Sequence, residues 1–521
     1  MRFPFGWFAA LSLTACVTFN PQSRFVQRTY FPSPPPPEAA IELPTPAFSK
    51  AQGFTKHDEL MAFVEALATE HADVATLTQV GTSQRGRDIP MLRLVGADPK
   101  VRVFFQGGLH GNEPAGTEGL LLLVHRLLND PEFRPLLDGV DLAVIPVANP
   151  DGFEHQMRHA ANGLDLNRDQ TKLEIEESHH LKRAFHDFNP DVAVDFHEYR
   201  PYRRDFALLG TNGITNPYDV MFLYSGNLNV PEPLRDLTRS VFVDAVRDEM
   251  DDRGLRHHDY VVSRSVHGDI WFNQGSVQAR SSATHFALAH SVSLLVEVRG
   301  VALGRHAFER RVLSTFWVAE RVLKTATANA ERIRDVLQQS VGLPEKIAVV
   351  QEPGVVQGTL KAIDLAEHAM VDLEVTVRNH LASTATQTRT RPQAYAVLPA
   401  AEGLLEKIER LGLQTVRLDA PTELEVERYA VREVRREPHR YEGQRQQSVT
   451  VDVEASPQTL PEGTYLVRLD RPGANLAFEL FEPEAPNSFV AFGVVRVKPN
   501  SSLPFVRVMG GADALLSPSK P

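Results

Sequence analysis

Long apolar runs alternate with amphipathic stretches between about residues 50 and 340. Four runs have the length of strands and are apolar at almost every position: Val101–Phe105, Leu142–Val147, Val192–Phe196 and Val292–Val298. Strands of this kind are usually covered on both faces of their sheet. The pattern therefore predicts an α/β domain whose sheet is sandwiched between helices.

Helical patterns fall before, between and after these strands. A helix is predicted at His57–Glu70, and Glu118–Leu128 is a strongly apolar helix. Leu181–Phe188 is helical up to an Asn-Pro pair. The long run His306–Gln339 carries apolar side chains at helical spacing, which indicates packing against the sheet.

Further along the chain the period changes to two residues. Apolar and polar side chains alternate across Val371–Val377 and Val449–Val453. Such alternation is typical of half-buried antiparallel strands. One helix is predicted among them, at Glu402–Leu411. We therefore expect a larger domain at 49–342 and a smaller, mostly antiparallel β domain at 343–521.

The first sixteen residues have the pattern of a signal peptide. The apolar stretch Phe3–Leu13 follows a single arginine and is too short to span a bilayer. The next residues, Leu-Thr-Ala-Cys16, resemble a bacterial lipobox, and Cys16 is the only cysteine in the chain. A cysteine carrying two acyl chains anchors a protein stably to a membrane. The alternative is an ordinary signal peptide with a chance cysteine.

The lipoprotein interpretation predicts where the protein resides. Cleavage before Cys16 would leave it lipid-anchored in the bacterial cell envelope. Val17 at the next position favours the outer membrane, with the protein facing the periplasm. Residues 17–48 are rich in proline, which favours extended geometry, so we expect a tether outside the folded core.

Composition excludes several classes of protein. The chain has 521 residues, of which 42% are hydrophobic and 23% charged, as in ordinary globular proteins. A largely disordered, collagen-like or multi-span membrane protein is therefore excluded. Lys and Arg total 55 against 66 Asp and Glu, a net charge of −11. No basic field for nucleic acid is expected, and the oligomeric state stays open.

Candidate metal ligands follow two of the predicted strands. Val101–Phe105 leads into Gly-Gly-Leu-His-Gly-Asn-Glu, so His110 and Glu113 lie just past a strand end, where ligands bind in α/β sheets. The same His-x-x-Glu spacing recurs at His306 in a helix that looks structural. A catalytic zinc needs a third ligand, and His197 follows another strand. Alternatively, His197 is a strand-end histidine capped by its neighbours.

Glu297 interrupts the apolar strand near residue 295. A buried carboxylate normally requires a partner. Two interpretations remain open from sequence. Arg299, two residues further on, is a candidate partner for a structural ion pair. Alternatively, Glu297 faces a zinc-bound water and acts as a general base.

A polar segment follows the strand near residue 145. It contains Arg158, Asp165, Asn167 and Arg168 within eleven positions. Arginine and asparagine together form a fork of donors suited to a carboxylate, and a second arginine can stabilise an oxyanion. The alternative is a polar surface loop.

These motifs carry a family resemblance. His-Gly-Asn-Glu-Pro, Gly-Leu-Asp-Leu-Asn-Arg-Asp, Asp-Phe-His-Glu-Tyr and Leu-Leu-Val-Glu-Val-Arg-Gly, in this order, resemble the zinc carboxypeptidase family of carboxypeptidase A type. The match covers about 80–310. It implies the zinc exopeptidase fold, a mixed, mostly parallel eight-stranded sheet sandwiched between helices. The sequence after Glu297, Val298-Arg299-Gly300 and then Gly304-Arg305 before Glu309, resembles a bacterial long-form branch whose members also carry a C-terminal β domain.

The resemblance also implies a role for each candidate residue. One zinc ion would be bound by His110, Glu113 and His197, with Glu297 as the general base. Asn167 and Arg168 would bind the substrate's terminal carboxylate. Arg158 would be the arginine beside the scissile carbonyl, and Asp165 the aspartate that orients the first histidine. The mobile tyrosine of the digestive enzymes has no counterpart in the matching stretch. Arg280 and His285 of that stretch, and Tyr260 further upstream, are candidates for the residue that covers the substrate.

The predicted function is a zinc metallocarboxypeptidase that acts on peptides or peptidoglycan stem fragments. Two alternatives remain. A zinc amidoacylase would remove acyl groups from amino acids, and a non-catalytic surface module would only bind. A Ser-His-Asp hydrolase is disfavoured, because no Gly-x-Ser-x-Gly elbow follows any strand.

Overall fold

A computed structural model describes residues 24–35 and 41–516. Its centre is an eight-stranded sheet in the order β1-β2-β4-β3-β5-β11-β7-β8. The core strands β4, β3, β5 and β11 are parallel, whereas β1, β2 and β7 join antiparallel. The strand bounds are β1 Ala75–Thr82, β2 Asp88–Val95, β3 Val101–Gly107, β4 Val140–Ile145, β5 Val192–Tyr199, β7 Val220–Leu223, β8 His257–Asp259 and β11 Val292–Arg299.

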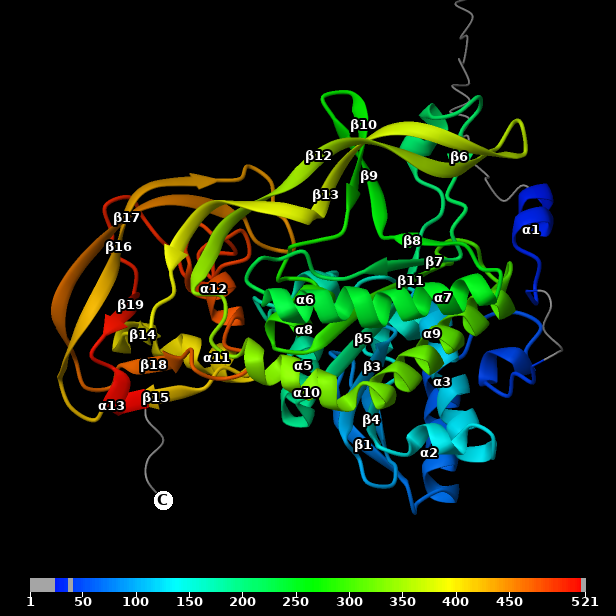
Figure 1. Ribbon diagram of the computed structural model, residues 1–521, viewed down its shortest axis with the longest axis horizontal. Helices are drawn as coiled ribbons and strands as arrows, with labels where there is room; N and C mark the ends of the chain where they lie inside the picture. Colours follow the sequence, from blue (N-terminus) through cyan, green and yellow to red (C-terminus); the bar gives the residue numbers. More distant parts are fainter. Residues whose placement is uncertain (1–23, 36–40, 517–521) are drawn as a thin grey trace, which may run out of the picture.

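Helices cover both faces of this sheet, as the apolar strands predict (Figure 1). Successive side chains of a strand point to opposite faces. Phe104 packs with Phe185 and Phe286 of two helices on one face, and Phe105 belongs to the larger core on the other face. The predicted fold class is therefore confirmed. The helices are α2 His57–Glu70, α3 Pro114–Asn129, α4 Pro150–His155, α5 Glu176–Phe188, α6 Glu232–Leu237, α7 Asp244–Asp252, α8 Ser282–Leu288, α9 Phe308–Ala328 and α10 Ala330–Ser340.

The C-terminal part of the chain forms a six-stranded antiparallel sheet in the order β15-β18-β14-β19-β16-β17. This confirms the predicted smaller, mostly antiparallel β region. Its elements are β14 Ala394–Val397, β15 Thr415–Arg417, β16 Thr422–Arg436, β17 Gln447–Leu460, β18 Tyr465–Arg468 and β19 Phe505–Gly510, with the helices α11 Leu405–Arg410, α12 Leu476–Phe481 and α13 Asp513–Leu516.

A third sheet connects the two regions. The long hairpin of β12 Lys346–Asp364 and β13 Ala369–Thr390 pairs with β10 Asp269–Gln274, and β10 pairs with β9 Val261–Val266. The short strand β6 Ile214–Thr215 completes the order β6-β12-β13-β10-β9. Figure 1 shows this hairpin running above the α/β body from the C-terminal sheet toward β6. The two regions therefore share a sheet.

The described part of the proline-rich stretch differs from the prediction. Residues Arg24–Tyr30 form helix α1, and both Val26 and Phe31 are buried against Ile363 of the hairpin. The Phe31 ring lies 3.8 Å from the guanidinium carbon of Arg299. This cation–π contact and the apolar burial hold the segment on the body, so the expectation of a tether outside the core is wrong here. Cys16 and the predicted signal peptide lie outside the described residues.

The described helices were also compared with the length and hydropathy that a membrane span requires. Within residues 24–35 and 41–516, none of them is long and apolar enough to cross a bilayer.

Candidate active site

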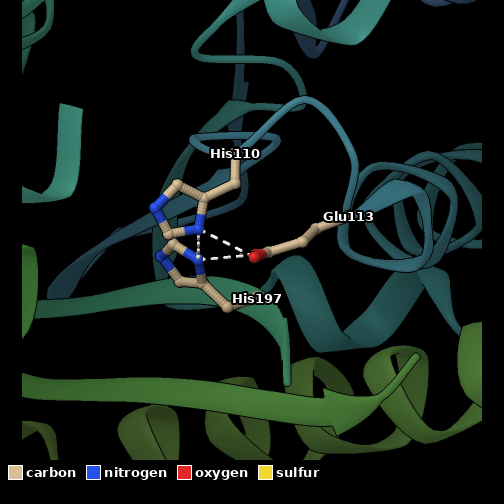
Figure 2. Close-up of side chains that lie close together, drawn as sticks. All are labelled: His110, Glu113 and His197. Atoms are coloured by element: carbon tan, nitrogen blue, oxygen red, sulfur yellow. Dashed lines mark hydrogen bonds and ion pairs between the residues drawn. The ribbon is translucent and has the colours of Figure 1, made fainter. Parts of the chain in front are cut away.

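The structure brings His110, Glu113 and His197 together at one edge of the central sheet. The Nδ1 atoms of the two histidines lie 3.0 Å apart, and each is 2.8 Å from a carboxylate oxygen of Glu113. Figure 2 shows the three side chains converging on a single point. They are the only group of three potential ligands found among the described residues. All three are buried.

The backbone explains this convergence. Strands β3 and β5 are parallel neighbours, with Gly107 at the end of β3 opposite Phe196, so His110 just past β3 meets His197 near the end of β5. Gly108 has a φ of 61° and turns the chain sharply out of β3. Gly111 lies so close to Gly152 that a β carbon there would come within 1.9 Å of the Gly152 carbonyl carbon. The glycine-rich sequence is therefore a steric requirement of the loop that presents His110.

The histidine rings are oriented for metal binding. The Nε2 atom of His110 lies 3.1 Å from Asp165, and that of His197 lies 2.7 Å from Asp195. A ring nitrogen beside a carboxylate carries the proton, which leaves the lone pair on Nδ1. Two such lone pairs and the Glu113 carboxylate then face one another, an arrangement that repels unless a cation lies between them. The donor set therefore fits a zinc ion at about 2.0–2.2 Å from each atom.

Asp195 was not assigned a role from sequence. Its Oδ1 accepts a hydrogen bond from Gln106 at 3.2 Å, which fixes the carboxylate that orients His197. A signal was present, because residues two apart on a strand share a face. Asp195 and His197 have that spacing.

Glu297 lies directly opposite His197 in the pairing of β11 with β5. Its Oε2 atom is buried and has no hydrogen-bond partner within the described residues. Burial, and next the negative charge of Glu113, raise the pKa of Glu297 to about 8. A carboxyl group in such surroundings holds a proton readily, as a group that accepts and returns protons must.

The structural ion pair considered for Glu297 is absent. The guanidinium of Arg299 lies over the Phe31 ring, and its Nη2 donates to the Tyr202 hydroxyl at 3.1 Å. Arg299 therefore binds the N-terminal segment. Of the two interpretations of Glu297, the structure favours the one in which the carboxylate faces the metal ligands.

The predicted polar segment lies beside the ligands and is not a free surface loop. Arg158 donates two hydrogen bonds to Asp165 Oδ2, at 3.0 and 2.8 Å, and its Nη1 lies 3.5 Å from Glu113. One edge of the guanidinium is therefore held while the other faces the ligands. The side-chain oxygen of Asn167 accepts a hydrogen bond from the backbone N–H of Ser282 at 2.8 Å. Arg168 donates to the backbone oxygen of Asn167 at 2.7 Å.

Arg158, Asn167 and Arg168 line a cavity of about 960 Å³, together with His110, Glu113 and Glu297. Its floor includes Met221, Leu223 and Leu295, and Tyr260 forms part of its wall. Burial, and next the charge of Glu297, raise the pKa of Tyr260 to about 12, so the hydroxyl keeps its proton at neutral pH. Tyr260 is therefore placed where a tyrosine can cover the substrate.

The other two candidates for the missing tyrosine differ from each other. Arg280 lines the cavity, with its guanidinium carbon 5.2 Å from the centre of the Tyr441 ring. His285 is completely buried and lies beside His186, with ring centres 5.8 Å apart. His285 is therefore part of the core and not of the cavity wall.

The C-terminal region helps to build the site. Val350, Glu352 and His380 of the hairpin line the cavity, as does Glu484 of the C-terminal region. Glu442, from a turn beyond β16, accepts a hydrogen bond at 2.9 Å from the backbone N–H of Asp165. These contacts between distant parts of the chain have no local sequence signal, and the sequence prediction missed them.

Comparisons with known proteins found similar sequences and similar structures. Residues 60–196 match the family model for zinc carboxypeptidases. Carboxypeptidase 2 of Trichophyton rubrum is 27% identical over 475 residues, covering 88% of this chain and 87% of that protein. Mouse carboxypeptidase M is 34% identical over 132 residues, 22% of this chain and 30% of its own. A metallo-carboxypeptidase structure from Burkholderia cenocepacia aligns with a TM-score of 0.41 and 19% identity, over 53% of this chain and 70% of that one.

Proposed function

We propose that this chain, whose residues 60–196 match the zinc carboxypeptidase family model and which is 27% identical to a carboxypeptidase over 88% of its length, removes C-terminal residues from short peptides, including peptidoglycan stem peptides. One observation carries the catalytic part of the proposal. His110, Glu113 and Glu297 line one cavity, His197 completes the ligand group beside them, and the Oε2 atom of Glu297 has no hydrogen-bond partner within the described residues. The hairpin over that cavity supports small substrates, since a folded chain would have to displace it.

The residues divide the chemistry among them. Zinc held by His110, Glu113 and His197 would supply a water whose pKa is lowered to roughly 7. Glu297 takes a proton from the attacking water and delivers it to the leaving amine. Arg158 stabilises the oxyanion that forms on the scissile carbonyl.

Asn167 and Arg168 determine which peptide bond of the substrate is cleaved. In this proposal they bind the substrate's terminal carboxylate through a fork of donors. A peptide without a free carboxylate lacks this interaction, so cleavage is restricted to the last peptide bond. The requirement for a free terminal carboxylate distinguishes a carboxypeptidase from a deacylase or a binding module.

The test compares peptides that differ only at the C-terminus. The free acid is expected to be hydrolysed at least about a hundredfold faster than the amide, since the amide leaves the buried donors without an anionic partner. The measurement is release of the terminal residue, followed by mass spectrometry. Equal rates on both peptides would contradict the proposal, and faster release of acyl groups from single acyl-amino acids would indicate an amidoacylase.

We further propose that the protein is lipid-anchored through Cys16 to the cell envelope and faces the periplasm. The support is the Leu-Thr-Ala-Cys sequence after a short apolar run, with no second cysteine in the chain. In a Gram-negative host the full chain is expected in the outer-membrane fraction. Cys16→Ser is expected to abolish labelling by a palmitate analogue and to move the protein from the membrane fraction to the soluble fraction. Equal membrane attachment of the variant and the parent would contradict this prediction.

A further inference from the structure

The wall of the catalytic cavity is rich in arginine, although the whole chain has a net charge of −11. Seven arginines line it against five glutamates. Three of the glutamates are already engaged: Glu113 with the histidines, Glu198 with Arg311 and Glu484 with Arg389. The arginines are Arg158, Arg168, Arg200, Arg203, Arg264, Arg280 and Arg378.

Five of these arginines have no place in the mechanism above, and one of the five, Arg280, packs over the Tyr441 ring, which leaves four. Arg158, Arg168 and Arg280 lie beside the metal ligands and the neighbouring polar segment. The side chains of Arg200, Arg264 and Arg378 make no hydrogen bond or ion pair within the described residues. Arg203 makes one long contact, 3.7 Å from Asp205, and its buried Nε has no hydrogen-bond partner there.

These four arginines come from two opposing walls. Arg200 and Arg203 follow directly after β5, the strand that carries His197. Arg264 and Arg378 belong to the five-stranded sheet, which lies above the α/β body in Figure 1.

The register places the second pair on one face of that sheet. Asn273 of β10 pairs with Arg378 on one side and with Val262 on the other, and all three line the cavity. Arg264 lies two residues after Val262 and so shares its face. Arg200 and Arg264 are exposed, whereas the apolar floor residues are buried, so these arginines lie toward the opening of the cavity.

The position of the arginines indicates which part of a substrate they meet. An exopeptidase holds the chain terminus deepest, so the residues before the scissile bond extend toward the opening. We propose that Arg200, Arg203, Arg264 and Arg378 bind acidic side chains upstream of the scissile bond, which makes this a carboxypeptidase for acidic peptides. This inference rests on the proposed function. Guanidinium groups form paired hydrogen bonds with carboxylates, and like charges gathered in one cavity favour an anion between them.

The test uses two peptide sets that are identical except for Glu or Gln at the second and third positions before the scissile bond. The enzyme is expected to show a kcat/KM at least about tenfold higher for the Glu set at low ionic strength, as for the gain of a charged hydrogen bond. Raising the salt concentration is expected to reduce this ratio, because screening weakens exposed charge interactions.

Arginine variants test whether the preference for Glu over Gln arises in this cavity. Arg264→Gln combined with Arg378→Gln is expected to lower the Glu/Gln ratio to about threefold or less, through the loss of two charged hydrogen bonds. Arg435→Gln, an exposed arginine of β16 away from the cavity, is the matched control and is expected to keep the parent ratio. Thermal melting and the rate on the Gln set show whether the double variant is folded.

Each outcome decides one of the two claims. If the enzyme cleaves both sets at equal rates, or if the double variant keeps the full preference, the acidic-peptide inference is overturned while the carboxypeptidase stands. If it cleaves neither set, with or without added zinc, the proposed function itself fails. A loss of preference in Arg435→Gln as well would show that overall charge, and not this cavity, sets the ratio.

Discussion

Glu297→Gln is expected to lower kcat by at least about a hundredfold while the protein folds and keeps its metal. Glutamine has the shape of glutamate but cannot take a proton from water. Glu297 lies opposite His197 in the neighbouring strand and makes no ion pair with any residue that the structure describes, so the substitution breaks no observed side-chain contact. A large loss of rate would therefore report the loss of a proton acceptor.

The stability of this variant separates catalysis from folding. A folded-state pKa of about 8 lies above the ordinary value of 4.5, so keeping Glu297 in the folded protein at neutral pH costs free energy. Removing the ionisable group relieves that cost, and the metal-free variant is expected to melt at the same temperature as the metal-free parent or higher. The measurement pairs thermal melting, zinc content and peptidase rate on one preparation. A variant that melts far lower but keeps its rate would make Glu297 a structural residue.

The ligand set was predictable from sequence because it depends on strand ends. His110 and His197 each follow an apolar run, and parallel neighbours in a sheet end at the same edge. The glycines around His110 reinforced this prediction, because a chain that turns out of a strand and packs closely against another loop requires them. The alternation of apolar and polar residues after residue 370 likewise predicted antiparallel strands.

What sequence could not give depends on contacts between distant parts of the chain. Arg299 makes its cation–π contact with Phe31, which lies 268 positions earlier in the sequence, and no local pattern connects the two. The hairpin that covers the cavity was predicted as part of a separate domain, because strand pattern does not specify which sheet a strand joins. Arg264 and Arg378 share a face only through their pairing with β10. Charge in the cavity wall is therefore a property of the fold.

The second large effect concerns the metal. Dialysis against a chelator is expected to abolish peptidase activity, and zinc is expected to restore it. Two Nδ1 lone pairs and a carboxylate converge within 3.0 Å of one another, so the site requires a cation to neutralise their repulsion. Metal binding to the folded state alone also stabilises it, so the melting temperature is expected to fall on dialysis and recover with zinc.

Glu113→Gln tests the ligand directly. The amide lacks the negative charge, and loss of a ligand is expected to weaken zinc binding by more than the roughly 10–100-fold typical of an orienting partner. Glu309→Gln is the matched control, since Glu309 belongs to the second His-x-x-Glu sequence but lies in helix α9, outside the ligand group. Zinc content and activity are expected to collapse together in the first variant and to stay at the parent's level in the second. Full zinc content in Glu113→Gln would mean that the ion is bound elsewhere, and the assignment of Glu297 as the base beside it would fall as well.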